Sequence, residues 1–150
     1  MSAQSSSNPA PDPGLLGEQL VAQWVATKGG TVLYQRWHCR FGELDVVALN
    51  AAADLIFIEV KTRQPYNWDS DGSLAITRSK QTKLWKAAQC FFLKHPQYTD
   101  RPCRFDIALV HYSPQSRSQP TQPGFSRTIA GYQLTLVNYL INALEFNQRL

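Results

Sequence analysis

Two short apolar stretches in the first half of the chain contain charged side chains whose types and spacing suit metal-assisted chemistry. Asp45 lies within the sequence LDVVAL, and Glu59 and Lys61 lie within LIFIEVK. Carboxylate oxygens are the ligands that Mg²⁺ prefers, and a lysine ammonium stabilises negative charge on a reacting phosphate. Two acids beside a lysine therefore suggest a site for metal-dependent phosphoryl chemistry.

The strands that carry these residues are predicted to pair as an antiparallel hairpin. Side chains alternate between the faces of a strand, so Glu59 and Lys61 project from one face, opposite to Val60. A turn centred on residue 52 pairs residues whose numbers sum to 104, which places Asp45 across from Glu59. The same register places Glu43 across from Lys61, with paired Cβ atoms about 5 Å apart.

Opposed carboxylates repel one another, and burial would force one of them to take up a proton. A divalent cation between Asp45 and Glu59 removes the repulsion, and Mg²⁺ is commonly held by one or two carboxylates with water and phosphate. In the structural alternative, Glu43 and Lys61 form an ion pair while the other two acids point into solvent. A register shift of one residue would also separate the acids, so the sequence leaves both interpretations open.

The remaining elements are predicted to build one α/β domain around this hairpin. Helical spacing of apolar residues predicts a helix from Gly14 to Lys28, and Thr77 is a suitable N-cap for a helix that ends near His95. Leu44, Val46 and Ala48 are expected to share one face of their strand. Strands are predicted over residues 31–39, 43–49, 55–62, 103–112 and 131–137.

The order helix, three strands, helix and strand indicates a mixed central β-sheet flanked by helices, followed by a short strand. A C-terminal helix is predicted from about Asn138. Residues 1–13 are rich in Ser, Pro and Ala and are expected to be a disordered tail. Residues 14–150 then form the single domain, in which 113–127 are expected to be a mobile loop.

Charge is distributed unevenly along the chain. Residues 1–60 contain three Lys or Arg and six Asp or Glu, whereas residues 61–104 contain nine Lys or Arg and three Asp. Lys80, Lys83 and Lys86 of the second predicted helix contribute to the basic stretch. This order indicates an anionic partner close to the carboxylates, although an unevenly charged solvated surface would give the same pattern.

Composition argues against several classes of protein. The three cysteines show no CxxC spacing, so neither a disulfide framework nor a zinc site is expected, and they suit a reducing compartment. The first thirteen residues contain no basic residue and no apolar run, so no secretory signal is predicted. No apolar segment approaches the ~20 residues of a membrane-spanning helix, so a cytoplasmic protein without a membrane partner is expected.

Two levels of resemblance follow from these segments. Asp45, thirteen intervening residues and then Glu59-Val60-Lys61 resemble the PD-(D/E)xK nuclease signature, with Leu44 where the signature has proline. Five blocks in order resemble the YraN family of small bacterial proteins: LGEQLVAQWVATKGG, CRFGELDVVAL, LIFIEVKTR, AITRSKQTKLWKAAQCFFL and RFDIALV. They cover most of residues 15–110, although Arg36 and His38 stand where Asn and Arg would be expected. That family is similar in sequence to archaeal Holliday junction resolvases, which implies a restriction-endonuclease-like fold.

The resemblance implies a metal-dependent endonuclease that hydrolyses phosphodiester bonds in DNA, at branched or structured sites. Asp45, Glu59 and the backbone carbonyl of Val60 would hold Mg²⁺ or Mn²⁺. Lys61 would position or deprotonate the attacking water and neutralise charge in the transition state. Glu18 on the first helix would act as a further ligand or orient water, although an ordinary first-turn glutamate would look the same.

Nucleic acid is the implied partner, and DNA is favoured over RNA. Lys80, Lys83 and Lys86 would bind backbone phosphates, together with Arg63. Arg63 and Arg104 have a structural alternative, which is an ion pair with an acid such as Asp106. A homodimer with two symmetric sites would suit a junction substrate. The alternative function is a non-catalytic nucleic-acid-binding protein that retains the nuclease-like fold.

Overall fold

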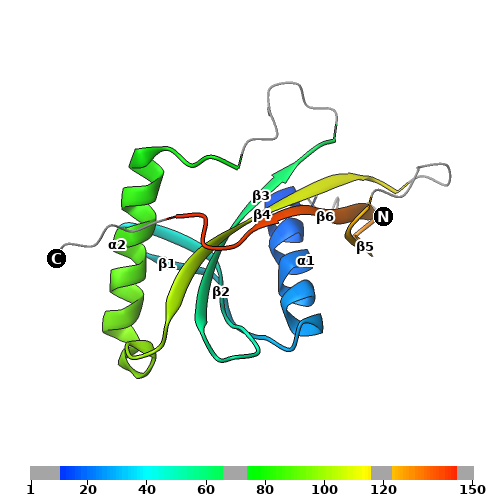
Figure 1. The fold of residues 1–150 in the computed structure, drawn as a ribbon. Helices are drawn as coiled ribbons and strands as arrows, with labels where there is room; N and C mark the ends of the chain where they lie inside the picture. The colour runs from blue at the N-terminus through cyan, green and yellow to red at the C-terminus, as the bar shows by residue number, and fades with distance from the viewer. Residues whose placement is uncertain (1–10, 66–73, 116–122, 145–150) are drawn as a thin grey trace, which may run out of the picture.

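In the described part of the chain, six strands form one mixed sheet with the order β1-β2-β3-β4-β6-β5 (Figure 1). The computed structural model describes residues 11–65, 74–115 and 123–144. β3 and β4 are parallel, whereas every other neighbouring pair is antiparallel. This arrangement confirms the predicted α/β fold with a mixed sheet. The strands are β1 (Thr31–Cys39), β2 (Gly42–Leu49), β3 (Leu55–Arg63), β4 (Cys103–Pro114), β5 (Phe125–Ile129) and β6 (Tyr132–Leu140).

Two α-helices cover the sheet, and side-chain caps fix where each begins. α1 (Pro13–Thr27) starts with proline, and the Asp12 carboxylate accepts a hydrogen bond from the Gly14 amide at 3.0 Å. α2 (Arg78–Lys94) starts after Thr77, whose hydroxyl accepts from the Lys80 amide at 3.2 Å. A short 3₁₀ helix, η1 (Pro96–Tyr98), follows α2. Both helices agree with the predicted ones to within about a residue.

The helices lie on opposite faces of the sheet, and each covers its own hydrophobic core (Figure 1). Leu20 of α1 packs with Val46 and Ile58, whereas Phe91 of α2 packs with Phe57 and Phe105. Successive residues of β3 therefore enter different cores, which explains why the central strands are almost continuously apolar. A charged residue in such a strand lies between two cores unless the strand extends beyond them.

The C-terminal helix was predicted to start at about Asn138, and this start is wrong. Residues 138–140 continue β6 and pair with residues 107–109 of β4. Tyr139 stabilises this extension, because its ring lies 4.5 Å from that of Trp24 and its hydroxyl donates to Asp106 at 2.6 Å. The alternating aromatic and aliphatic residues of YQLTLVNYL favour a strand through Leu140. Residues 145–150 lie outside the described part of the chain.

Two predicted irregular segments also need correction at their ends. Asp12 and Pro13 belong to the start of α1 rather than to a tail, while residues 1–10 of that tail lie outside the described residues. In the predicted loop 113–127, β4 continues to Pro114 and β5 begins at Phe125, whereas residues 116–122 are not described. β5 is a short edge strand with largely exposed polar residues, which is why its composition resembles a loop.

Cys39, Cys90 and Cys103 are free thiols. In the described parts of the chain, neither helix has the length and apolar character needed to cross a membrane.

Candidate active site

The β2–β3 hairpin has the predicted register up to the point where the charged residues begin. The pairs from Leu49↔Leu55 to Val46↔Ile58 all sum to 104, as predicted. The ladder ends there, so the expected backbone pairing of Asp45 with Glu59, and of Glu43 with Lys61, is wrong. The Asp45 side chain causes this difference, because its Oδ2 accepts the Val60 amide at 2.9 Å in place of a strand carbonyl.

Strand β2 is irregular at Asp45, which turns this side chain toward β3. Leu44 packs in the core under α2, whereas Val46 packs in the core under α1, so the prediction that both share a face is wrong. On β1, the described ladder contains the pairs Gln35↔Val46 and Trp37↔Leu44 but not the pair between them. Arg36, at that position, has a left-handed φ of 51°, which is uncommon outside glycine.

Asp45 and Glu59 form a partly buried pair of like charges, in which 12% of the Glu59 side chain is exposed. Their carboxyl groups lie within hydrogen-bonding reach of each other, but two carboxylates have no proton to share. Glu59 Oε2 is buried without a hydrogen-bond partner among the described residues. Burial, followed by the charge of Asp45, raises the pKa of Glu59 to about 8, and burial also raises the pKa of Asp45. Lys80 Nζ opposes this from 3.4 Å away, at Glu59 Oε1.

Glu18 reaches the site because a glycine precedes it on α1. A Cβ atom at Gly17 would overlap the hydroxyl of Thr62 on β3, so only glycine allows the helix to approach the strand this closely. Glu18 is itself buried, with 6% of its surface exposed. The sequence therefore explains the position of Glu18 through its small neighbour rather than through its own charge.

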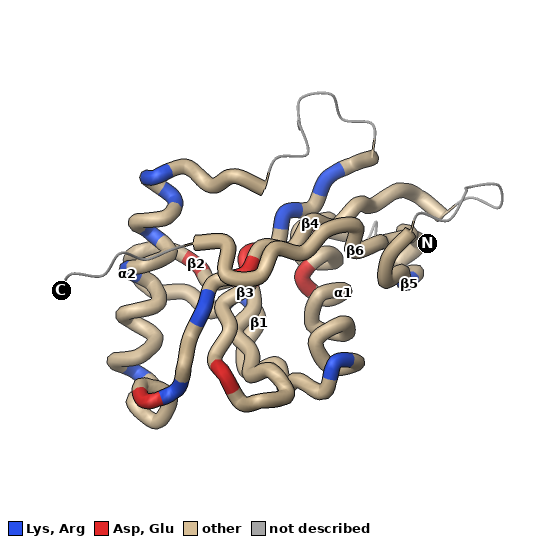
Figure 2. The backbone as a smooth tube through the Cα atoms, viewed as in Figure 1, with Lys and Arg blue, Asp and Glu red and all other residues tan. Residues whose placement is uncertain are grey.

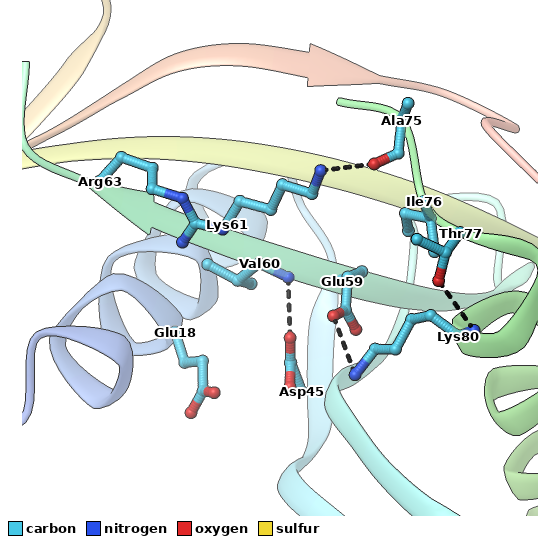
Figure 3. Close-up of a pocket in the computed structure, with 10 residues that line it drawn as sticks. All are labelled: Glu18, Asp45, Glu59, Val60, Lys61, Arg63, Ala75, Ile76, Thr77 and Lys80. Atoms are coloured by element: carbon cyan, nitrogen blue, oxygen red, sulfur yellow. Dashed lines mark hydrogen bonds and ion pairs between the residues drawn. The ribbon is translucent and has the colours of Figure 1, made fainter. Parts of the chain in front are cut away.

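Arg36 is the residue of the site to which the sequence assigned no role. Its Nε lies 2.6 Å from Glu18 Oε2, and its Nη2 lies 2.7 Å from Asp12 Oδ2. Burial raises the pKa of Glu18 to about 7, although the Arg36 hydrogen bond acts in the opposite direction. Glu18 is thus bound by Arg36 and lies apart from the Asp45–Glu59 pair (Figure 3). The one clue in the sequence was that Arg36 replaces an expected Asn.

A pocket of about 390 Å³ brings together seven of the nine predicted site residues (Figure 3). The remaining wall comes from Ala75, Ile76 and Thr77, which lead into α2. Lys83 and Lys86 lie further along α2 and do not line this pocket. The predicted residues in the lining are Glu18, Asp45, Glu59, Val60, Lys61, Arg63 and Lys80.

The basic residues of the pocket have different partners. Lys61 Nζ donates to the Ala75 carbonyl at 2.7 Å, on the side of the pocket that leads into α2. Arg63 Nη1 donates to the carbonyl of its neighbour Thr62 at 2.9 Å, at the exposed end of β3. Arg104 lies elsewhere and pairs with Asp106 at 3.0 Å, which confirms the structural alternative for this arginine.

The Asp45–Glu59 pair fits a hard divalent cation such as Mg²⁺ or Mn²⁺. All of its donors are oxygen atoms, one of these atoms is buried without a partner, and both carboxyl groups have raised pKa values. Among the described residues, no three Asp, Glu, His or Cys side chains converge on one point. The site therefore offers two carboxylates, which is the number that Mg²⁺ commonly uses beside a phosphate.

Sequence comparisons cover the whole of this site. Residues 17–110 match the model of the uncharacterised protein family UPF0102. One UPF0102 protein, from Trichodesmium erythraeum, is 41% identical over 88% of this chain and 88% of its own length. Another, from Acaryochloris marina, is 41% identical over 87% and 88%, and a third, from Thermosynechococcus vestitus, is 50% identical over 64% and 77%. The matched range includes every residue that lines the pocket.

Proposed function

We propose that this chain, which belongs to the UPF0102 family, is a metal-dependent endonuclease that hydrolyses phosphodiester bonds in branched or structured DNA. The family membership confirms the resemblance to the YraN proteins. The observation that carries the proposal is the partly buried Asp45–Glu59 pair in a pocket that is also lined by Lys61, Arg63 and Lys80. Two carboxylates side by side and shielded from water destabilise a fold unless a proton or cation lies between them. Such a pair therefore suits a function in binding a cation.

Each charged residue of the pocket has a part in this proposal. Asp45 and Glu59 would hold the cation, which when bound polarises a phosphate and acidifies water. Lys61 extends from the same strand as Glu59 and would provide positive charge where the phosphate gains negative charge during the reaction. Glu18 would accept a hydrogen bond from the attacking water, while Arg36 keeps its carboxylate in place.

The basic residues around the pocket support an anionic substrate. Arg63 and Lys80 lie in the pocket lining itself, and both would contact phosphates on either side of the bond that is cleaved. Lys80 already lies near a carboxylate, so a cation at Glu59 would displace its ammonium toward the substrate. When metal and DNA bind together, the Asp45–Glu59 pair would then contact the metal and Lys80 would contact the DNA.

The test combines a metal titration with a cleavage assay on the same samples. Mn²⁺ is titrated calorimetrically into the wild type, Asp45→Asn and Glu59→Gln, and each protein is then incubated with a branched DNA and a linear duplex. Glu43→Gln is the matched control, because Glu43 is an exposed acid on the same strand that does not line the pocket. We expect both site variants to lose Mn²⁺ binding and cleavage, and the control to retain both.

Two other outcomes would contradict the proposal. If the wild type binds Mn²⁺ but cleaves neither DNA, the protein is not a nuclease on these substrates. If no variant differs from the wild type in Mn²⁺ binding, the two acids are structural. In that case the non-catalytic alternative predicts DNA binding that weakens with salt and gives no metal-dependent product.

A further inference from the structure

An aromatic side chain at the turn between β1 and β2 lies outside both hydrophobic cores. Phe41 is half-buried and, in the described part of the chain, belongs to neither core cluster. Its ring has cations close to it: Arg40 Cζ lies 4.6 Å from the ring centroid and Lys86 Nζ lies 5.7 Å from it. Trp37, only four residues earlier, packs against the core under α2. Core packing therefore explains Trp37 but not Phe41.

Lysines along α2 connect this turn to the pocket. Lys80, Lys83 and Lys86 recur every three residues, which places them on one row of the helix, about 9 Å long at ~1.5 Å per residue. Lys80 lies in the pocket lining, and Lys86 lies beside the Phe41 ring. Between them, the Lys83 Cβ would be 3.9 Å from a Cβ added at Gly42, whose φ of 146° favours glycine.

The helix that forms this path has one sign of charge. α2 contains five Lys or Arg and neither Asp nor Glu, and Figure 2 shows blue positions along it without a red one. The exposed Glu43, just after the turn, is the acid that lies nearest in sequence. We define the turn–helix surface as Arg40, Phe41, Lys83 and Lys86.

We infer that the turn–helix surface binds an unpaired nucleic-acid strand that leads into the pocket. Phe41 would stack on a base, while Arg40, Lys83 and Lys86 would contact phosphates. The ~9 Å lysine row corresponds to about two to three nucleotides at the ~3.4 Å rise of a stacked strand. This inference rests on the proposed function and adds to it a substrate class, namely nucleic acid with an unpaired segment beside the cleaved bond.

The combination of ring and cations separates this partner from the alternatives. A base exposes its π-face to an aromatic side chain when it is unpaired and unstacked, whereas the faces of bases within a duplex are covered by their neighbours. A surface for duplex backbones or for an acidic protein would need the cations but not Phe41. Cations beside the ring also suit stacking, because arginine contributes cation–π contacts to bound bases.

Fluorescence anisotropy with labelled oligonucleotides tests the inference. Binding is measured in EDTA, so that no cleavage occurs, with a single strand of about 15 nucleotides and with the blunt duplex of the same sequence. Phe41→Leu keeps an apolar side chain of similar size but removes the aromatic face. We expect it to bind the single strand about tenfold more weakly and the duplex within about twofold of the wild type, because one stacked base contributes about this much.

Salt dependence separates stacking from charge. Phe41→Leu should leave the slope of log K against log salt unchanged, since it removes no phosphate contact. Lys86→Ala should reduce the single-strand slope by about 0.7. The matched controls are Phe125→Leu, whose ring lies 4.1 Å from Arg127 on β5, and Lys28→Ala, whose ammonium lies 6.0 Å from Trp24. Both controls should bind as the wild type does.

The inference is overturned if Phe41→Leu binds the single strand as the wild type does, or if it loses single-strand and duplex binding equally. Mn²⁺ titration of the same proteins keeps this result separate from the proposed function. Metal binding at Asp45 and Glu59 without an effect of Phe41→Leu would remove only the turn–helix surface. If Phe41→Leu weakens binding of the single strand only and the protein binds no Mn²⁺, the turn–helix surface is supported and the proposed nuclease function is contradicted.

Discussion

Two carboxylate sites in the same sheet, one fully buried and one partly buried, have different arrangements of partners. Asp106 on β4 has no exposed surface and accepts hydrogen bonds from Arg104, from the Tyr139 hydroxyl and from the Asn142 amide. Among the described residues, the Asp45–Glu59 pair accepts the Val60 amide, has a lysine at 3.4 Å and contains one buried oxygen without a hydrogen-bond partner. One site satisfies its charge within the fold, and the other does not.

The difference shows how the chain separates stability from function. Asp106 joins β4 to β6 and to the residues that follow β6, so its hydrogen bonds stabilise the pairing of β4 with the end of β6. The charge of Asp45 and Glu59 opposes folding in the absence of a ligand, as their raised pKa values indicate. A buried acid is therefore a functional candidate when its partners are missing, rather than because it is buried.

Replacing Asp106 or Asp45 by asparagine should give the largest difference in stability between the two sites. Asp106→Asn removes the charge that Arg104 and Tyr139 require, and we expect it to lower the free energy of unfolding by about 3 kcal/mol, or roughly 10 °C in Tm. Asp45→Asn should leave stability unchanged or increase it, because it relieves repulsion. Thermal unfolding in EDTA measures both variants. Equal destabilisation by the two would show that both acids are structural.

Replacing Lys61, which lines the pocket, should have the next largest effect, on DNA cleavage. Lys61→Ala should reduce cleavage on the order of a hundredfold or more, because it removes positive charge at the reacting phosphate, while DNA affinity changes only a few-fold. Arg104→Ala is the counterpart in the Asp106 network and should lower Tm without a specific effect on cleavage by the remaining folded protein. Single-turnover cleavage and anisotropy measure the two effects. Equal losses of binding and cleavage in Lys61→Ala would contradict its assigned role.

The pH dependence of stability provides a smaller effect. The folded pKa of Glu59, about 8, lies above its ordinary value of 4.5, so the folded state holds the extra proton between these pH values. The free energy of unfolding without metal should therefore fall as pH rises from about 5 to 8. Glu59→Gln cannot ionise, and at pH 8.5 it should be about 1–2 kcal/mol more stable than the wild type. Urea unfolding in EDTA measures this, and a pH profile identical to wild type would exclude the raised pKa.

Most of the fold could be predicted because its signals are local. Asn50 begins a turn in which its side chain accepts the amides of Ala52 and Asp54, and this turn fixes the hairpin register. Thr77 and Pro96 likewise delimit α2. The end of β6 was missed because a contact far apart in sequence, Tyr139 with Asp106, stabilises it. The edge strand β5 was missed because its short, polar sequence resembles a loop, although it pairs with the neighbouring β6.

The site could be predicted only as a set of residue types. Alternation placed Glu59 and Lys61 on one face of β3, but it could not show that β2 changes faces at Asp45. The left-handed backbone of Arg36 has no sequence signal, since arginine rarely adopts it. The contact of Arg36 with Glu18 depends on how closely Gly17 lets α1 approach β3, which is a property of the packed structure.

The end of the β2–β3 ladder at Val46↔Ile58 has a consequence for ion size. Beyond that pair, among the described residues, the Val60 amide bonds the Asp45 side chain instead of the backbone of β2. The distance between the Asp45 and Glu59 carboxyl groups can therefore change by side-chain rotation while the ladder up to Val46↔Ile58 stays intact. Metal–oxygen distances of about 2.1 Å for Mg²⁺ and about 2.4 Å for Ca²⁺ would then both be accommodated. The site would then discriminate between these ions by their preferred coordination numbers rather than by their size. A larger ion that binds without supporting the reaction would inhibit DNA cleavage.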